Sequence, residues 1–282
     1  MNQLPTAKRA QILHLLAEGC SMRSTSRLAD VSINTVTKLL EDAGRACILL
    51  HDELVRGIKG YRRIQCDEIW SYVYAKNKNL AKIESEPIDW AGSIWTWTAL
   101  DAESKLIVSW LVGERDAEHA ISFMTDLRDR VDDPVQITTD GFHPYEEAVE
   151  YAFGGDVDFA QLVKPPLGVK EPNKKVVRIG DPDLDYVNTS LVERHNLTIR
   201  MQNRRFTRLT NAYSRKARNH VMSLALQFVW YNFCQIHSTI SVTPAMEAGL
   251  DSTVRDPEWI VAKIDEIAPK PNRPKKYKKK AK

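Results

Sequence analysis

The chain has 282 residues, of which 43% are hydrophobic and 27% charged, and its formal net charge at pH 7 is only +3. This size and composition are typical of a soluble globular protein with room for two modest domains. The longest apolar run, 221–236, is interrupted by Gln227 and Asn232 and is too short to span a bilayer, which excludes a membrane-spanning protein.

The N-terminus and the cysteines indicate the compartment. The first residues contain no small-residue cleavage site, so we do not expect a signal peptide. The cysteines are scattered and form no C-x-x-C pair: Cys20, Cys47, Cys66 and Cys234. This pattern favours a reducing compartment, and it argues against a disulfide framework or a zinc site. We therefore predict a cytoplasmic protein.

Charge is unevenly distributed along the chain. Residues 61–163 carry 9 Lys or Arg against 20 Asp or Glu, a balance of −11, whereas residues 190–220 carry 8 against 1, a balance of +7. The last fourteen residues, 269–282, carry 8 basic side chains and no acidic one. An acidic body with two basic segments suggests that an anionic polymer is held beside a carboxylate-rich centre.

Three helices are predicted in the first fifty residues. Apolar side chains recur at helical spacing over 7–17 and Gly19 ends that helix, while Ser21 and Ser32 are suitable N-caps for two more, with Gly44 as a stop. This is the pattern of a helix-turn-helix module, whose later helix faces DNA base edges with its first turn. The residues expected to bind DNA there are Asn34, Thr35, Thr37 and Lys38. A small three-helix bundle without a DNA role is the alternative.

From Tyr61 the sequence period becomes strand-like. A connecting helix and linker over 45–60 lead to three predicted strands, the last two joined by a hairpin turn at "DAES". A helix over 116–130, a short buried strand ending at Asp140, a second helix and a further strand follow. Segment 165–187 is expected to be a loop or an insertion because it is rich in Pro, Gly, Lys and Asp, and helices resume at 188–203 and 214–236.

This element order predicts an α/β fold of the ribonuclease H-like type. Its mixed five-stranded sheet has the order 3-2-1-4-5 and is flanked by helices, so the first and fourth strands lie side by side. We expect five parts in chain order: a helix-turn-helix DNA-binding domain (1–50), a linker (51–63), a ribonuclease H-like catalytic domain (64–236), a C-terminal helical extension (237–268) and a basic disordered tail (269–282).

Three acids stand where local propensity would not place them. Asp67 lies inside a strand, Asp140 ends the short strand "QITTD", and Glu193 is the one acid of a basic helix. If the first and fourth strands are neighbours, Asp67 and Asp140 meet near the carboxyl ends of these strands, and a helix across that edge can bring Glu193 there. Such convergent carboxylates need cations, and hard oxygen ligands select Mg²⁺ or Mn²⁺. Two ions can then bind the attacking and leaving oxygens of a phosphoryl transfer.

Each acid also has an ordinary interpretation. Asp67 can pair with Arg63, Asp140 precedes a glycine as turn residues do, and Glu193 can be a helix first-turn acid. Glu68 can be the ligand in place of Asp67, since strand alternation puts the two on opposite faces and only one is expected to point at the site. The prediction therefore depends on the joint placement of the three acids.

Basic and polar residues around Glu193 are candidates for DNA contacts. Arg200 lies seven residues after Glu193, on the same helix face, where it can hold a phosphate beside the metal site. Further DNA-binding candidates are Arg204, Arg205, His195 and Asn196, although structural hydrogen bonds are the alternative for the last two.

Four stretches resemble bacterial and archaeal insertion-sequence transposases of the DDE class, most closely the group named for insertion sequence one. They are "IQCDEIWSYV", "TTDGFHPY", "LVERHNLTIRMQNRRFTRLTNAYSRKARNH" and "YNFCQIHSTISVTPAMEAGL". The resemblance covers about residues 61–250 and implies a catalytic triad of Asp67, Asp140 and Glu193, with two Mg²⁺ or Mn²⁺ ions. Several members of that group begin with a cysteine-rich zinc motif that this sequence lacks, so we predict no zinc.

The predicted function is therefore transposition. The partners expected are transposon-end and target DNA, no membrane, and a second copy of the chain in a homodimer or higher oligomer, which places the protein at the nucleoid. Two alternatives stay open: a domesticated helix-turn-helix regulator with an inactive core, and a ribonuclease H-like nuclease or resolvase that cuts without joining. A basic-tailed protein that binds RNA is a third.

Overall fold

The structure is a computed structural model that describes residues 3–80, 82, 90–165, 168–207 and 210–269. The basic tail predicted from residue 269 onward therefore lies outside the described residues from position 270. Within the described ranges, no helix is both long and apolar enough to cross a membrane.

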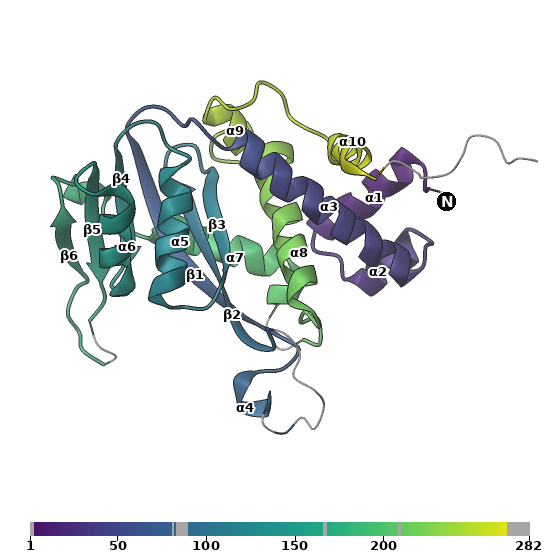
Figure 1. The fold of residues 1–282 in the computed structure, drawn as a ribbon, viewed down its shortest axis with the longest axis horizontal. Helices are drawn as coiled ribbons and strands as arrows, with labels where there is room; N and C mark the ends of the chain where they lie inside the picture. Colours follow the sequence, from purple (N-terminus) through teal and green to yellow (C-terminus); the bar gives the residue numbers. More distant parts are fainter. Residues whose placement is uncertain (1–2, 81, 83–89, 166–167, 208–209, 270–282) are drawn as a thin grey trace, which may run out of the picture.

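A six-stranded mixed sheet forms the centre of the larger part of the molecule (Figure 1). Its order is β3-β2-β1-β4-β5-β6; the first three strands are antiparallel, and β4 and β5 run parallel to β1. The strands are β1 (Arg62–Val73), β2 (Gly92–Asp101), β3 (Ile107–Gly113), β4 (Val135–Asp140), β5 (Val157–Val163) and β6 (Lys174–Ile179). The predicted ribonuclease H-like order 3-2-1-4-5 is confirmed.

Strand β6 was not expected. It pairs antiparallel with β5 inside the segment predicted to be a loop, so that prediction is wrong for Lys174–Ile179. All six side chains of its sequence KKVVRI are at least partly exposed, and lysine and arginine are common on edge strands, where they discourage pairing with another chain. A strand without a buried face lacks the alternation by which strands are recognised in a sequence.

Helices cover both faces of the sheet. In Figure 1, α5 (Ala117–Arg128) and α6 (Pro144–Phe153) lie on one face and α7 (Ser190–Gln202) lies on the other. The helices predicted at 116–130, 188–203 and 214–236 are confirmed. The remaining helices are the short α4 (Asn77–Leu80), α8 (Ala217–Val229) with its π-helical extension Trp230–Cys234, α9 (Pro244–Glu247), α10 (Pro257–Ile267) and the 3₁₀ turns Leu184–Tyr186 and Arg204–Phe206.

The N-terminal helices form as the sequence predicts, with one correction. They are α1 (Thr6–Ala17), α2 (Met22–Leu28) and α3 (Ile33–Leu54). The side chains of Ser21 and Ser32 accept hydrogen bonds from the backbone N–H groups of Ser24 and Thr35, as N-caps do. Helix α3, however, does not stop at Gly44.

Gly44 is a packing residue and not a helix terminus. A Cβ at this position would lie 2.4 Å from the Met222 Cβ and 2.6 Å from the Met222 Cα, on the neighbouring helix α8. The absence of a side chain therefore lets α3 and α8 approach closely, and α3 continues for ten residues beyond the predicted stop. One rigid helix thus joins the N-terminal helices to the sheet domain.

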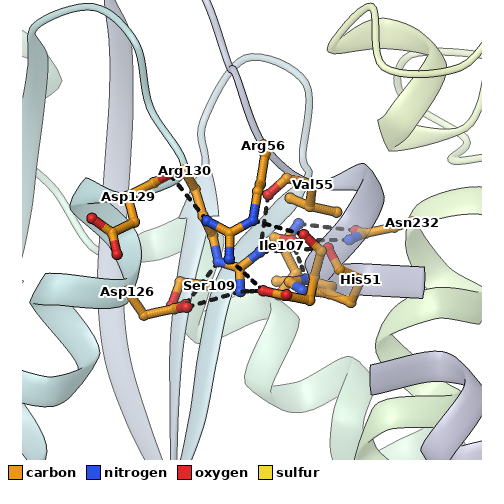
Figure 2. Close-up of polar contacts among 10 residues, drawn as sticks. His51, Val55, Arg56, Ile107, Ser109, Asp126, Asp129, Arg130 and Asn232 are labelled. Atoms are coloured by element: carbon orange, nitrogen blue, oxygen red, sulfur yellow. Dashed lines mark hydrogen bonds and ion pairs between the residues drawn. The ribbon is translucent and has the colours of Figure 1, made fainter. Parts of the chain in front are cut away.

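The end of α3 is fixed by a buried polar network (Figure 2). Arg130 forms a two-pronged ion pair with Asp126 at 2.8 Å per prong and donates to the Val55 carbonyl at 2.9 Å. His51 lies 3.2 Å from the Ile107 carbonyl, which also accepts a hydrogen bond from Asn232. These contacts join α3, α5, β3 and the π-helical turn after α8 in one place.

The C-terminal helix completes the N-terminal part of the molecule. Arg9 on α1 pairs with Asp265 on α10 through two contacts of 2.7 Å, and α10 lies beside α1 and α3 in Figure 1. One continuous cluster of buried apolar residues extends from Ala10 and Leu13 to Ile264 and includes the α5–α6 face of the sheet. The three N-terminal helices are therefore packed on the rest of the chain.

Candidate active site

The sheet register brings Asp67 and Asp140 together. Gln65 on β1 lies opposite Thr138 on β4, so Asp67, two residues further on, reaches the level of Asp140 at the end of β4. Asp67 is in the middle of β1 and not near its end, because β1 continues to Val73 in its pairing with β2. The predicted juxtaposition of the two acids is thus correct.

Glu68 joins the same cluster. One carboxylate oxygen from each of Asp67, Glu68 and Asp140 lies within 4.8 Å of the others. The prediction that only one of Asp67 and Glu68 can point at the site is therefore wrong. The two side chains do leave β1 on opposite faces, but the pairing of β1 with β4 ends at Gln65, and beyond it both carboxylates can reach Asp140.

Glu68 lies on the α5–α6 side and is almost completely buried. Its side chain is 1% exposed and forms an ion pair of 3.0 Å with Arg115, whose guanidinium also lies 3.5 Å from Asp140. Burial raises the pKa of Glu68 to about 7, and the Asp140 charge adds to the rise. The neighbouring Tyr145 hydroxyl and Arg115 oppose the rise, although the Tyr145 hydroxyl does not reach hydrogen-bonding geometry.

Asp67 lies on the α7 side and is held by that helix. Its Oδ2 accepts a hydrogen bond of 2.8 Å from Asn196 Nδ2. Burial raises the pKa of Asp67 to about 6, and the charges of Asp140 and Glu193 contribute to the rise. The ionised carboxylates of Asp67, Asp140 and Glu193 repel one another, and a cation among them would relieve the repulsion.

Helix α7 is positioned by β1 itself. The Gln65 Oε1 accepts hydrogen bonds from the backbone N–H groups of Leu191 and Val192, at 2.9 and 3.2 Å, in the first turn of α7. This satisfies N–H groups that have no partner within the helix. It also fixes Glu193, one residue later, relative to Asp67.

Glu193 lies beside the cluster and outside the group of three. Its side chain is 46% exposed and pairs with Lys164 at 2.8 Å, and Thr189 donates to the same oxygen at 3.0 Å. Burial alone would raise the pKa of Glu193, but the bonds from Lys164 and Thr189 outweigh it and lower the pKa. The pKa of Lys164 is raised, chiefly by its bond to Glu193 and further by the charges of Asp67 and Asp140. The Lys164 ammonium thus interacts with three acids.

The donor set fits a hard divalent cation. The cluster offers carboxylate oxygens alone, and Glu68 Oε1 is buried without a hydrogen-bond partner in the part of the chain that the structure describes. Oxygen ligands of this kind suit Mg²⁺ and Mn²⁺ better than softer metals. Arg115 and Lys164 balance the negative charge from two sides.

The predicted DNA-binding residues fall into two groups. Asn34 and Lys38 are exposed on the first turns of α3, Thr35 and Thr37 are half-buried, and Lys38 pairs with Asp42 at 2.9 Å. At the other end of α7, Arg204 is exposed, Arg200 is half-buried and Arg205 donates to the Ser214 hydroxyl at 2.9 Å. The predicted DNA contacts of these residues stay predictions.

His195 and Asn196 require a correction. His195 is 3% exposed and packs between the rings of Phe228 and Tyr231, so in this structure it is a core side chain. Burial lowers the pKa of His195 to about 3, which keeps the ring neutral. Asn196 is 5% exposed and holds Asp67. Both side chains face the inside of the molecule, His195 toward α8 and its π-helical extension and Asn196 toward β1, so neither is available to DNA in this structure.

Three further residues of the site were not found from the sequence: Gln65, Arg115 and Lys164. Arg115 and Lys164 reach the acids from segments distant in the sequence, whereas Gln65 lies on β1 two residues before Asp67 and binds the backbone of α7. Arg115 follows β3, and its guanidinium carbon lies 3.7 Å from the centre of the Phe142 ring. Only the three-dimensional arrangement brings Arg115 and Lys164 to the carboxylates.

No model of a known protein family matches the chain, and no curated protein matches it. Among solved structures, the simian T-cell lymphotropic virus intasome in complex with PP2A regulatory subunit B56 gamma is 14% identical over 86% of this chain and 74% of that one, with a TM-score of 0.39. A piggyBac transposase synaptic complex with hairpin DNA is 10% identical over 92% and 69%, with a TM-score of 0.38. The mariner Mos1 paired end complex with Mg is 13% identical over 81% and 80%, with a TM-score of 0.23. Such values do not place the chain in a family.

Proposed function

We propose that the chain is a DDE-class DNA transposase of an insertion sequence. It would hydrolyse a phosphodiester to free a 3′-OH and transfer that 3′-OH to target DNA. The observation that carries the proposal is the carboxylate cluster of Asp67, Glu68 and Asp140 at the β1–β4 edge, with Glu193 of the basic helix α7 beside it. The sequence resemblance of 61–250 to insertion-sequence transposases supports the same function.

In this proposal Asp67, Asp140 and Glu193 hold two divalent ions, which would lower the pKa of an attacking water and neutralise charge on the leaving 3′ oxygen. Asn196 keeps the Asp67 carboxylate oriented. Arg115 anchors Glu68 and Asp140 from the opposite side, so Glu68 shapes the site from its buried position. Lys164 has to release Glu193 before that carboxylate can become a ligand, and a DNA phosphate is a suitable new partner for the ammonium.

DNA recognition is assigned to the other end of the molecule. The first turns of α3, with Asn34, Thr35, Thr37 and Lys38, would read the terminal inverted repeats from the major groove. Arg200, Arg204 and Arg205 would contact phosphates. Two transposon ends must be joined, so we expect a dimer or a higher oligomer on DNA.

The test is cleavage of a duplex that carries the element's ends. Asp140→Asn should abolish Mg²⁺-dependent nicking and leave DNA binding intact, since Asp140 is 30% exposed at the end of β4 and its substitution should not disturb the core. Asp181→Asn, an exposed change in the loop after β6, is the control. Unchanged nicking by Asp140→Asn would reject the proposal. Nicking without joining to a target plasmid would indicate a nuclease or resolvase instead.

A further inference from the structure

A second site lies away from the carboxylates, in a groove of about 1030 Å³. One side of the groove is formed by the α1–α2 turn, α2 and the first half of α3. The other side is the segment that follows α7, and residues of α8 also line it. Thr37 of the predicted recognition helix lines this groove, together with Arg23 on α2.

The groove is strongly cationic. Four arginines line it, Arg23, Arg204, Arg205 and Arg215, and three of them (Arg23, Arg204 and Arg215) are exposed. Among the described residues that line it there is no Asp or Glu, although the chain contains 37 of them. A groove lined by arginines and by no acidic residue suits an anionic ligand.

Inside the groove, polar side chains lack partners. Gln227 is 4% exposed, and neither its amide nitrogen nor its amide oxygen has a hydrogen-bond partner among the described residues. Asn219 Oδ1, also in the lining, is buried and has no partner within the same residues. Buried polar atoms without partners are costly and uncommon, so their presence in a groove suggests that a ligand supplies the missing bonds.

The chemistry of the lining matches a nucleotide better than a simple anion. Inorganic phosphate would satisfy the arginines, but it has no planar base edge for the Gln227 amide and no ring to stack on Tyr213. A base edge offers a donor and an acceptor to this amide, and Gln and Asn are the side chains that pair with adenine in this way. Tyr213 adds an aromatic ring in the same lining, on which a base can stack.

The groove lies at the far end of α7 from Glu193. Gln202 lines the groove and follows Glu193 by nine residues on the same helix. Nine residues correspond to about 14 Å along an α-helix and to about two and a half turns, so the two side chains face opposite sides of α7. The groove is therefore a site separate from the carboxylates.

We propose that this groove binds one strand of DNA, with the phosphates at the arginines and one base at Gln227. The choice of DNA as the polymer rests on the proposed function. The groove would hold the strand between the N-terminal helices and the segment that follows α7.

The test is fluorescence anisotropy of the full-length protein with a labelled single strand, in EDTA so that no cleavage occurs. Arg23→Ala and Arg204→Ala should each weaken binding at least about threefold at low salt and reduce the salt slope by about 0.7. Gln227→Leu should weaken binding about fivefold or more with the slope unchanged, since it removes a base contact and no charge. Arg178→Ala is the matched control, because Arg178 is an exposed arginine on β6, at the opposite end of the molecule from α2 (Figure 1).

The outcomes separate this inference from the proposed function. Wild-type affinity in both arginine variants would overturn the groove assignment even if nicking depends on Asp140. Loss of binding in these variants would support the groove even if nicking proves independent of Asp140. Tighter binding of an RNA strand of the same sequence would overturn the assignment to DNA. If Gln227→Leu binds the strand with wild-type affinity and has a raised thermal unfolding midpoint, Gln227 does not contact the DNA.

Discussion

The acids of the candidate active site differ in what surrounds them, and this difference predicts different effects of their substitution. Glu68 is enclosed by Arg115 and the α5–α6 face, whereas Glu193 is half exposed and its cation partner, Lys164, comes from the surface. The buried Glu68 holds Arg115 at the site, although its raised pKa shows that the burial of its charge costs stability. The exposed Glu193 can exchange Lys164 for another cation at little structural cost, because exposed ion pairs contribute little to stability.

Glu193→Gln and Glu68→Gln should therefore have different effects. Glu193→Gln should reduce metal-dependent nicking at least about a hundredfold and change the free energy of unfolding by less than about 1 kcal/mol, as expected for an exposed ion pair. Glu68→Gln should raise that free energy at pH 7, because burial raises the pKa of Glu68 and its charged form therefore costs stability that glutamine does not. Urea unfolding and single-turnover nicking measure the two effects. Equal loss of stability in both variants would contradict this prediction.

For single residues, the sequence identifies the acids but not the basic side chains that pair with them. Asp67 inside a strand and Glu193 on a basic helix are visible because they violate local propensity. Alternation along β1 misplaces Glu68, since it assumes that β4 continues beside β1 beyond Gln65. Lys164 and Arg115 stand just after strands, where basic residues are common, so the surrounding sequence does not identify them as part of the site.

Among the elements, α3 has the widest role. It carries the predicted recognition residues at its start, packs on α8 through Gly44, and ends in the buried network of His51 and Arg130. The sequence predicts its start correctly, because Ser32 is an N-cap. It misplaces the end, because a glycine that permits close packing looks the same as one that ends a helix. Strand β6 is missed for a related reason, since it has no buried face.

Gly44→Ala should destabilise the protein. Alanine is the better helix former by about 1 kcal/mol, but its Cβ would overlap the backbone and Cβ of Met222. Overpacking of this kind costs about 1–3 kcal/mol, so a net loss is expected in urea unfolding. Gly155→Ala, where a Cβ meets nothing within 4 Å, is the control. A Gly44→Ala variant at least as stable as wild type would show that α3 and α8 are further apart.

The same helix should make stability sensitive to pH through His51. Burial, and next the Arg130 charge, lower the pKa of His51 to about 3, while the nearby Asp52 and Asp126 oppose the shift. The unfolded chain protonates His51 below about pH 6.5 and the folded chain does not, so the folded state loses stability as the pH falls. His51→Gln should therefore gain about 1.4 kcal/mol relative to wild type for each pH unit below about 6.5. Urea unfolding at pH 7.5, 6 and 5 measures this gain, and a constant difference would contradict it.

The whole molecule separates its charges. The acidic sheet domain contains the carboxylates, and the arginines gather at the end of α7 and along the groove toward α2. The shared apolar cluster keeps these parts in a fixed relation. A polymer held by the arginines therefore lies at a fixed place relative to the carboxylates. The sequence predicts this separation from charge counts alone, but not the groove, which forms only when α2, α3 and α8 pack together.

The basic C-terminal residues should add affinity of a different kind. Deleting 269–282 removes 8 positive charges, so it should weaken DNA binding and flatten its salt dependence through reduced counterion release. Site preference should not change, because contacts to phosphates carry no sequence information. Replacing the tail lysines with glutamine should give the same result. An unaltered salt slope would exclude this role.

The proposed binding of divalent metal by Asp67, Asp140 and Glu193 can be tested by anomalous diffraction from crystals of the protein–DNA complex grown with Mn²⁺. Manganese peaks are expected at about 2.0–2.3 Å from carboxylate oxygens of Asp67 and Asp140, with Glu193 turned from Lys164 toward the metal. Crystals that show DNA bound but no manganese at these carboxylates would contradict it.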